Sequence, residues 1–233
     1  MSANHATPKA TINTVISDFG GVLTTPLHDA FLALEATLEI SLEDLGSAMA
    51  APLQRGEPNP LYRLERGEVS EANYLKELSD DLAAITGRRS DLSGFGAAFF
   101  AGLHRNEEMI ALIIGLRDRG FRMALLTNNV REWAPLWRSM VAVDEIFTTI
   151  VDSSAVGLRK PEPEIYRLTL AEIGATPKQC LFIDDVEPNC EAARALGIRS
   201  VQFRDNEQAL AEIETALAAG PEPQLSEPAR SQT

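Results

Sequence analysis

The sequence of 233 residues is poor in the residue types that mark several classes of protein. The chain has two cysteines, which are too few for a disulfide scaffold. With three histidines besides, a zinc site is improbable. Lysine and arginine number 21 against 34 aspartate and glutamate residues, so the net charge of −13 argues against a basic surface for nucleic acid or anionic lipid. The longest apolar stretches, such as 109–116, fall far short of the roughly 18–20 residues of a membrane helix. We therefore expect a small soluble partner, with neither nucleic acid nor membrane involved.

The two ends of the chain differ in character from the rest. Residues 1–10 and 220–233 are polar, contain proline and have no hydrophobic period, so we predict flexible tails. No apolar segment follows a basic start, and Cys180 and Cys190 stand in apolar surroundings typical of small buried side chains. These features favour a cytoplasmic protein. They leave the oligomeric state unknown.

Apolar runs and helical patterns alternate along most of the chain. The predicted strands are 14–17, 121–126, 146–151, 180–183 and 199–203. The predicted helices between and around the later strands are 106–119, 131–140, 162–173, 188–196 and 206–218. The runs are nearly continuous rather than alternating, as in strands that are buried on both faces. We predict an α/β fold, with a Rossmann-like parallel sheet and helices on both faces.

One interval interrupts this alternation. Residues 26–103 contain helical patterns only, for example 27–40 and 70–85, with breaks at 56–60. We therefore predict a core formed by 11–25 and 104–219, with 26–103 as an inserted all-helical cap. Because ligands of such sheets bind outside the carboxyl ends of the strands, an insert at that edge would cover the site.

Polar residues follow four of the predicted strands. They are Asp18, Thr127, Asn128, Asn129, Lys160, Asp184 and Asp185. The carboxyl ends of parallel strands meet at one edge, so these side chains are expected to converge. Any one of them alone could be an ordinary turn or capping residue. Clustered carboxylates would repel one another unless a cation neutralised them, and hard oxygen ligands suit Mg²⁺. Lys160 and Thr127 could then hold the oxygens of a phosphoryl group.

Four segments carry a family resemblance. Residues 15–23 (VISDFGGVL), 125–129 (LLTNN), 157–166 (GLRKPEPEIY) and 181–198 resemble, in order, the four motifs of the haloacid dehalogenase-like (HAD) hydrolases. The helical interval is similar to the C1 cap of that family. Within it, residues 61–70 (LYRLERGEVS) resemble the corresponding part of the phosphatase domain of soluble epoxide hydrolases.

The resemblance implies a Mg²⁺-dependent phosphatase of a small phosphorylated metabolite, with specific roles for the residues at the strand ends. Asp18 would be the nucleophile that forms an aspartyl-phosphate. Asp18, Asp185 and the backbone carbonyl of Gly20 would bind the metal, with Asp184 either as a further ligand or as a support of the metal site. The phosphoryl group would be bound by Thr127, Asn128 and Lys160.

Position 20 departs from the family pattern. Most phosphatases of this family have a second aspartate there, which protonates the leaving oxygen, whereas this chain has Gly20. Loss of a positioned acid typically costs 10²–10⁴-fold in rate. Three alternatives follow: a substrate with a good leaving group, an acid supplied by the cap, with His28 and His104 as the candidates, or a non-catalytic or very slow phosphate-ligand-binding regulator on the same scaffold.

Other features are assigned to packing or to chemistry that we disfavour. The aromatic side chains Phe95, Phe99, Phe100, Trp133 and Trp137 have helical spacing, so burial explains most of them better than substrate contact. Phosphonate cleavage would need a cap lysine, and Lys76 lies in a helical pattern that favours a solvated charge. The acidic pair after 180–183 argues against metal-free dehalogenation.

Overall fold

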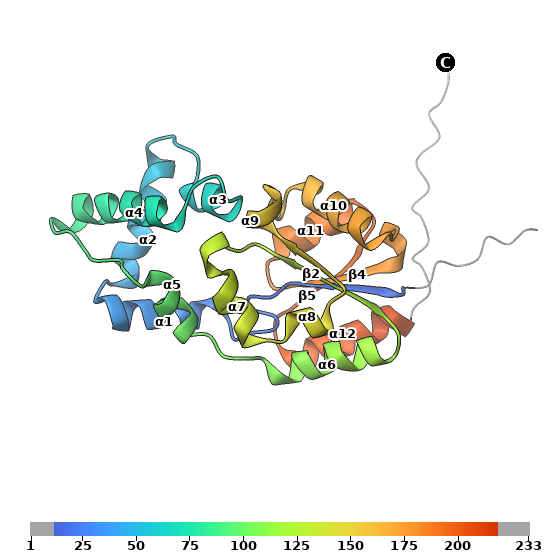
Figure 1. Ribbon diagram of the computed structural model, residues 1–233. Coiled ribbons are helices and arrows are strands. Elements are labelled where there is room, and N and C mark those ends of the chain that lie inside the picture. Colours follow the sequence, from blue (N-terminus) through green and yellow to red (C-terminus); the bar gives the residue numbers. More distant parts are fainter. Residues whose placement is uncertain (1–11, 219–233) are drawn as a thin grey trace, which may run out of the picture.

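The computed structural model describes residues 12–218 and contains one five-stranded parallel sheet (Figure 1). The strands are β1 (Thr14–Ser17), β2 (Arg122–Thr127), β3 (Thr149–Asp152), β4 (Cys180–Asp184) and β5 (Arg199–Gln202). Their order is β3-β2-β1-β4-β5, and every neighbouring pair is parallel. The chain adds β2 and β3 on one side of β1 and then adds β4 and β5 on the other side. The switch between the two sides lies beside β1, and α/β folds place their ligands at such a switch point. The predicted parallel α/β sheet is confirmed.

Helices cover both faces of the sheet. One face packs against α6 (Glu107–Asp118), α7 (Ala134–Met140), α8 (Val143–Ile146) and α12 (Asn206–Ala218). The other face packs against α10 (Pro163–Ile173) and α11 (Glu187–Ala195). Successive side chains of a strand point to opposite faces, so Val15 joins the first cluster and Ile16 the second. Both faces are apolar for this reason, which explains the nearly continuous apolar runs.

Most predicted elements lie within two residues of their observed bounds, but the strand predicted at 146–151 is misplaced. Residue Ile146 ends helix α8, and β3 begins only at Thr149. Ile146 and Phe147 are buried in the first core cluster without pairing with β2. Apolar residues of a short buried turn and of a buried strand are alike in sequence, so periodicity alone cannot separate them.

The interval between β1 and α6 is helical, as predicted. It contains α1 (Leu27–Leu38), α2 (Leu42–Gln54), α3 (Pro60–Glu65), α4 (Glu71–Thr86) and α5 (Phe95–Ala101). These five helices lie together at one end of the molecule in Figure 1, and we call them the helical insert. The helical insert has a core cluster largely of its own, which includes Leu34, Leu64, Tyr74 and Leu82.

The chain enters and leaves the helical insert at adjacent positions. Thr24 and Arg105 form an isolated antiparallel bridge, and the backbone N–H of Thr25 donates to the carbonyl of His104 at 2.8 Å. The short elements that complete the core are η1 (Arg131–Trp133), α9 (Ser153–Val156) and η2 (Pro177–Gln179). The predicted division into a core of 11–25 and 104–219 and a cap of 26–103 remains a prediction, and the predicted tails lie outside the described residues.

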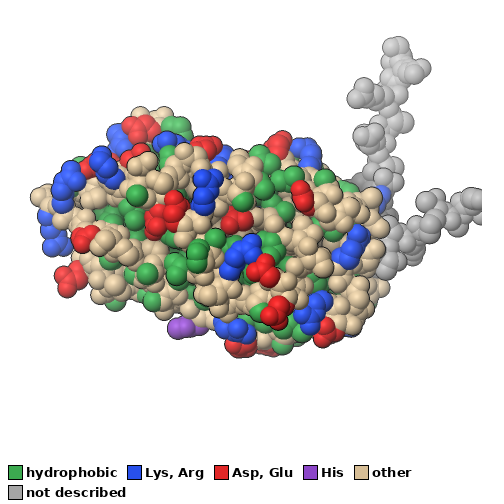
Figure 2. All heavy atoms as spheres, viewed as in Figure 1, with side chains coloured by type: hydrophobic (Ala, Val, Ile, Leu, Met, Phe, Trp, Pro, Cys, Tyr) green, Lys and Arg blue, Asp and Glu red, His purple; other side chains and the backbone are tan. Residues whose placement is uncertain are grey.

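The buried cysteines agree with the sequence analysis, and one face of the surface can be described. The face in Figure 2 carries acidic and basic side chains interspersed. Cys180 and Cys190 are free and fully buried, as expected of small apolar side chains. Among residues 12–218 we find no helix with the length and apolar character that spanning a bilayer requires.

Candidate active site

The polar residues predicted at the strand ends meet at one edge of the sheet. Asp18 follows β1, Thr127 ends β2 and Asp184 ends β4, with Asp185 next in the chain. Within the described chain, Asp18, Asp184 and Asp185 each offer a carboxylate oxygen, and these three oxygens lie within 4.8 Å of one another. The convergence follows from the parallel topology, because β1 lies between β2 and β4 and all three end at the same edge.

Lys160 is the centre of the charge network. Its side chain is 1% exposed, and its Nζ lies 2.8 Å from Asp18 Oδ1 and 2.7 Å from Asp184 Oδ2. Burial alone would lower the pKa of Lys160, but the two carboxylates outweigh it and raise that pKa well above its ordinary value. The lysine is therefore a permanent ammonium that fixes the positions of two acidic side chains.

Asp18 has one oxygen held and one oxygen available. Oδ1 accepts from the backbone N–H of Phe19 at 2.7 Å and contacts the ammonium of Lys160. Oδ2 accepts no hydrogen bond from the residues that the structure describes. A carboxylate that is oriented through one oxygen and open at the other has the arrangement that a nucleophile requires.

Asp184 and Asp185 occupy different environments although they are neighbours. Asp184 is fully buried and accepts three hydrogen bonds, from Lys160 Nζ, from the Val186 backbone N–H at 2.9 Å and from Asn189 Nδ2 at 3.0 Å. Asp185 instead packs against the loop after β1: a Cβ at Gly21 would lie 2.5 Å from Asp185 Oδ2. Gly21 has φ +76° and leaves that space open, so Asp185 has the freer carboxylate beside Asp18.

The electrostatics of the cluster leave excess negative charge. Burial, opposed by the ammonium of Lys160, raises the pKa of Asp18 to about 8. Burial and the neighbouring carboxylate of Asp184 raise the pKa of Asp185 to about 6. Three ionised carboxylates and one ammonium would carry a net charge of −2. A divalent cation would balance that charge, so the donor set fits Mg²⁺ in both ligand type and charge.

Two asparagines arrange the loops around the cluster. The side chain of Asn128 donates to the backbone carbonyl of Lys160 at 3.0 Å and accepts from its N–H at 2.8 Å. Its side chain is therefore used to hold the Lys160 loop, and the predicted contact of Asn128 with phosphate remains a prediction. The backbone N–H of Asn129 donates to Ser153 Oγ at 3.0 Å, which links the ends of β2 and β3.

A pocket of about 390 Å³ opens above the cluster and lies between the core and the helical insert. Its core end is lined by Asp18, Thr127, Lys160 and Asp185. Most of the surface contributed by the helical insert is apolar, from side chains that include Phe31, Met49, Leu61, Phe95, Phe99 and Phe100. The volume is that of a small-molecule site.

The aromatic residues do more than the sequence indicated. Trp137 is fully buried against Phe19, with ring centroids 5.4 Å apart, as expected of a core residue. Phe95, Phe99 and Trp133 also pack together, with Phe99 and Trp133 stacked at 5.3 Å, yet all three line the pocket. The expectation that burial explains most of these side chains is confirmed, since Phe95, Phe99 and Trp137 are buried, and the pocket borders some of them in addition. Helical spacing reports that a side chain is inside, but not that a pocket adjoins it.

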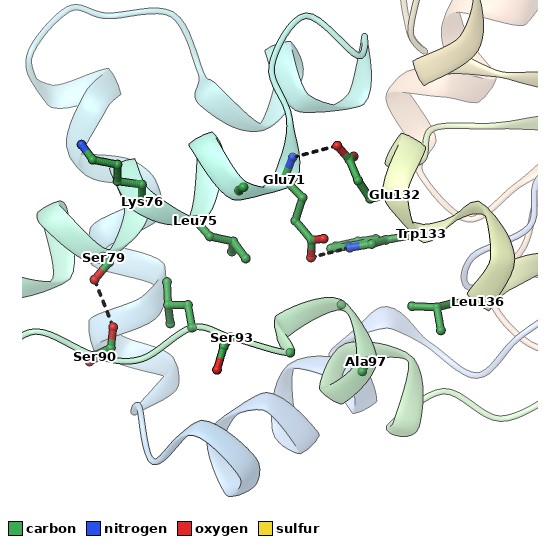
Figure 3. A pocket seen from close by; sticks show the side chains of 14 residues that line it. Glu71, Leu75, Lys76, Ser79, Ser90, Ser93, Ala97, Glu132, Trp133 and Leu136 are labelled. Carbon is green, nitrogen blue, oxygen red and sulfur yellow. Dashed lines mark hydrogen bonds between the residues drawn. The ribbon is translucent and has the colours of Figure 1, made fainter.

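A second, shallower groove of about 460 Å³ adjoins the pocket, and Trp133 lines both (Figure 3). In Figure 3 the carboxylate of Glu71 points at the indole of Trp133, which donates to it at 2.7 Å. A Cβ at Gly96 would lie 2.3 Å from the indole nitrogen, so glycine allows α5 to approach. Lys76 lies in this groove, largely exposed and 3.6 Å from Asp80, which confirms its interpretation as a solvated charge.

Position 20 lacks a carboxylate and also lies close to an apolar side chain. A Cβ at Gly20 would lie 3.1 Å from Cδ2 of Leu27, the first residue of α1. An apolar side chain thus borders the position at which the family pattern has an acid. His28 and His104 are exposed and neither lines the pocket. The structure therefore does not place the two histidine candidates beside Asp18, at the core end of the pocket.

Sequence reasoning missed a largely buried ion pair between the helical insert and the core. Glu65, the last residue of α3, accepts from Arg159 Nε at 2.6 Å, and the guanidinium of Arg159 lies 3.7 Å from the ring centroid of Tyr62. Both charged side chains line the pocket. The only signal in sequence is that Arg159 precedes Lys160, since nothing in the sequence of 61–70 indicates which residue faces the core.

A comparison with known families decides where this arrangement belongs. A family model described as haloacid dehalogenase-like hydrolase matches residues 12–197, which is most of the chain. The chain belongs to the haloacid dehalogenase-like hydrolases. It is a hydrolase of that family, and the match includes the helical insert and all of the strand-end residues described above.

Individual relatives of this HAD hydrolase are distant. Mouse bifunctional epoxide hydrolase 2 is 26% identical over 209 residues, which is 84% of this chain and 37% of that protein. The sesquiterpene phosphatase astK of Aspergillus oryzae is 25% identical over 84% of this chain and 92% of its own length. The chain spans less than two fifths of the length of the first curated relatives that it matches.

Solved structures share the fold. A HAD family enzyme of Bacteroides thetaiotaomicron, in complex with magnesium and inorganic phosphate, superimposes with a TM-score of 0.60 at 22% identity. The alignment covers 83% of this chain and 94% of that one. At this identity the likeness establishes the α/β fold of the HAD hydrolases and no more.

Proposed function

We propose that this HAD hydrolase is a phosphatase that cleaves a phosphate monoester with a largely apolar body, through a phosphorylated Asp18. The observation that carries the proposal is the open Oδ2 of Asp18 at the floor of a pocket whose other walls are mostly apolar. A phosphoryl group would lie at the polar end, near Thr127 and Lys160, and the organic body would lie among the rings of the helical insert. In this arrangement the insert acts as a cap. The sesquiterpene phosphatase among the relatives is consistent with such a body.

Asp18, Asp185 and the backbone carbonyl of Gly20 would hold Mg²⁺, and Asp184 would support the site through Lys160. When bound, the metal would neutralise the acidic cluster and the phosphate charge, so that one anion can approach another. The side chains of this chain do the rest. Lys160 orients Asp18, Thr127 offers a hydroxyl to a phosphoryl oxygen, and the apolar walls exclude water from the organic body.

The test compares the wild type with Asp18→Asn on p-nitrophenyl phosphate and acetyl phosphate in the presence of Mg²⁺. We expect turnover by the wild type and a loss on the order of 10⁴-fold or more in Asp18→Asn, because the covalent route is removed. Mass spectrometry of acid-quenched wild-type protein should find the phosphoryl group on the peptide that contains Asp18.

The matched control is Asp118→Asn, which changes an exposed aspartate far from the pocket and should retain full activity. Equal rates for the wild type and Asp18→Asn would reject Asp18 as the nucleophile. The second candidate function, a non-catalytic binder, would be supported if the wild type bound phosphate with Mg²⁺ but hydrolysed neither substrate. Gly20 is the observation that keeps this candidate in view.

A further inference from the structure

We propose that Glu65 supplies the acid and base chemistry that the family pattern assigns to position 20. This inference rests on the proposed phosphatase function and concerns the same pocket. Three acidic side chains line the pocket: Asp18, Asp185 and Glu65. Asp18 and Asp185 are engaged at the phosphoryl and metal end, so Glu65 is the carboxyl group left for proton transfer.

The core holds Glu65 by its backbone and by its side chain. Ser153 Oγ donates to the backbone carbonyl of Glu65 at 2.6 Å and accepts from the N–H of Asn129, two residues beyond Thr127. Arg159, adjacent to Lys160, donates to Glu65 Oε2. These bonds fasten the end of α3 to the strand ends that form the phosphoryl site. A residue of the helical insert is thereby fixed relative to the reacting end.

One oxygen of Glu65 remains available. Oε2 is held by Arg159, whereas Oε1 accepts no hydrogen bond from residues 12–218 as described. The side chain is 15% exposed, so it is largely removed from bulk water. A carboxyl group that is oriented by one oxygen and open at the other can carry a proton toward a ligand in the pocket.

The surroundings of Glu65 favour the protonated carboxyl more than the surroundings of an exposed glutamate do. Burial raises the pKa of Glu65, although the charges of Arg159, Lys160 and Arg66 oppose the rise. Glu65 also ends α3, where the helix dipole disfavours a negative charge. The other titratable neighbour is Tyr74 of α4, whose pKa burial raises to about 12. A phosphate anion in the pocket would raise the pKa of Glu65 further.

The chemistry balances in two steps. As Asp18 Oδ2 bonds to phosphorus and the bond from phosphorus to the ester oxygen breaks, the proton of Glu65 moves to that oxygen and the alcohol leaves. In the second step the Glu65 carboxylate takes a proton from water as the water oxygen bonds to phosphorus. The bond from phosphorus to Asp18 then breaks, inorganic phosphate is released, and both carboxyl groups return to their starting states.

The test uses two substrates that differ in their need for an acid. Octyl phosphate has a poor leaving group, whereas p-nitrophenyl phosphate has a good one. We expect Glu65→Gln to lower kcat/KM for octyl phosphate by about 10²–10³-fold and that for p-nitrophenyl phosphate by less than about fivefold. The wild-type rate on octyl phosphate should fall as the pH rises through the pKa of Glu65, and Glu65→Gln should lose this dependence. Glu65→Asp should recover part of the rate.

The control is Glu68→Gln, a half-exposed glutamate of the same stretch that does not line the pocket, and it should leave both rates unchanged. An equal fall on both substrates would show that Glu65 only positions Arg159 or the pocket wall, and it would overturn the proposal. An unchanged rate on octyl phosphate would overturn it as well. A wild type that is inactive on both substrates would instead reject the phosphatase function itself, and this proposal with it.

Discussion

The two ends of the pocket are built by opposite means. The core end consists of charged side chains, among them Lys160 and Asp184, which are fully buried and held by ion pairs and hydrogen bonds. The end formed by the helical insert consists mainly of aromatic and aliphatic side chains that pack as a second small core. Under the proposed function, the first arrangement would fix the reacting atoms, and the second would select a ligand by shape and polarity. Glu65 is the exception, a carboxylate of the insert that is attached to the core.

The comparison predicts that removing charge from the core end is costly in free energy of unfolding. Lys160→Met should lower the free energy of unfolding by about 3–5 kcal/mol at pH 8 without metal, because two buried carboxylates lose their counter-ion. Urea unfolding measures the change. Mg²⁺ should restore part of it, since the dication would replace the missing positive charge.

Lys178→Met is the control for this experiment. Lys178 is exposed, so its loss should change the free energy of unfolding by less than about 0.5 kcal/mol. A Lys160→Met protein as stable as the wild type would mean that the acidic cluster does not depend on the lysine.

A second prediction concerns pH and the acidic excess at the same end. The folded protein raises the pKa of Asp185 from 3.8 to about 6. A raised carboxyl pKa contributes stability below the unfolded value, and that contribution is lost as the pH rises through the folded value. In EDTA, the wild type should therefore lose up to about 3 kcal/mol relative to Asp185→Asn between pH 4 and pH 7.

Mg²⁺ at pH 7 should stabilise the wild type more than Asp185→Asn, because the variant lacks a ligand. The measurement is urea unfolding of both proteins across the pH range, with EDTA or Mg²⁺. A constant difference between the two proteins at every pH would contradict the raised pKa.

The smallest expected effect concerns the contact between Gly20 and Leu27, which lies at the boundary between the two ends of the pocket. Restoring an acid by Gly20→Asp requires Leu27 to move, since its Cδ2 lies 3.1 Å from the position of the new Cβ. Gly20→Asp with Leu27→Ala should raise kcat/KM on octyl phosphate by about 10–100-fold and on p-nitrophenyl phosphate by less than about threefold. Gly20→Asp alone should gain less.

Leu27→Ala alone is the control for pocket size. In the Glu65→Gln background, Gly20→Asp with Leu27→Ala should raise kcat/KM on octyl phosphate by a larger factor than in the wild type. The reason is that the new carboxyl group at position 20 and Glu65 would each protonate the same leaving oxygen, so the new acid matters more when Glu65 is absent. Equal gains on both substrates would show that the new carboxylate acts by some route other than protonation of the leaving group.

Much of the core end was predictable from sequence because its residues are tied to strand ends. A run such as 180–183 followed by two aspartates identifies a buried strand and the edge at which it ends, and parallel topology then brings Asp184 to Asp18. The strand at 146–151 shows the limit of this reasoning. Residues Ile146 and Phe147 are as apolar as β3 itself, and only the end of α8 and the start of pairing with β2 at Thr149 place them before the strand.

The end formed by the helical insert was predictable only as helix. Periodicity places Phe95 and Phe99 on a buried side, but it does not report that their rings border a cavity. No local pattern marks Glu65, whose proposed role depends on contacts with Ser153 and Arg159, about 90 positions away in the chain.

The sequence by itself determined the parallel α/β core, the helical interruption and the identities of the residues at the strand ends, because each depends on local hydrophobic pattern and on chain order. Only the tertiary structure decided that both oxygens of Asp184 accept hydrogen bonds while Oδ2 of Asp18 accepts none from the described residues. It also decided that Leu27 lies beside Gly20 and that Glu65 lines the pocket. Those outcomes depend on which surfaces of two separately packed cores meet, and long-range packing of that kind has no local trace in the chain.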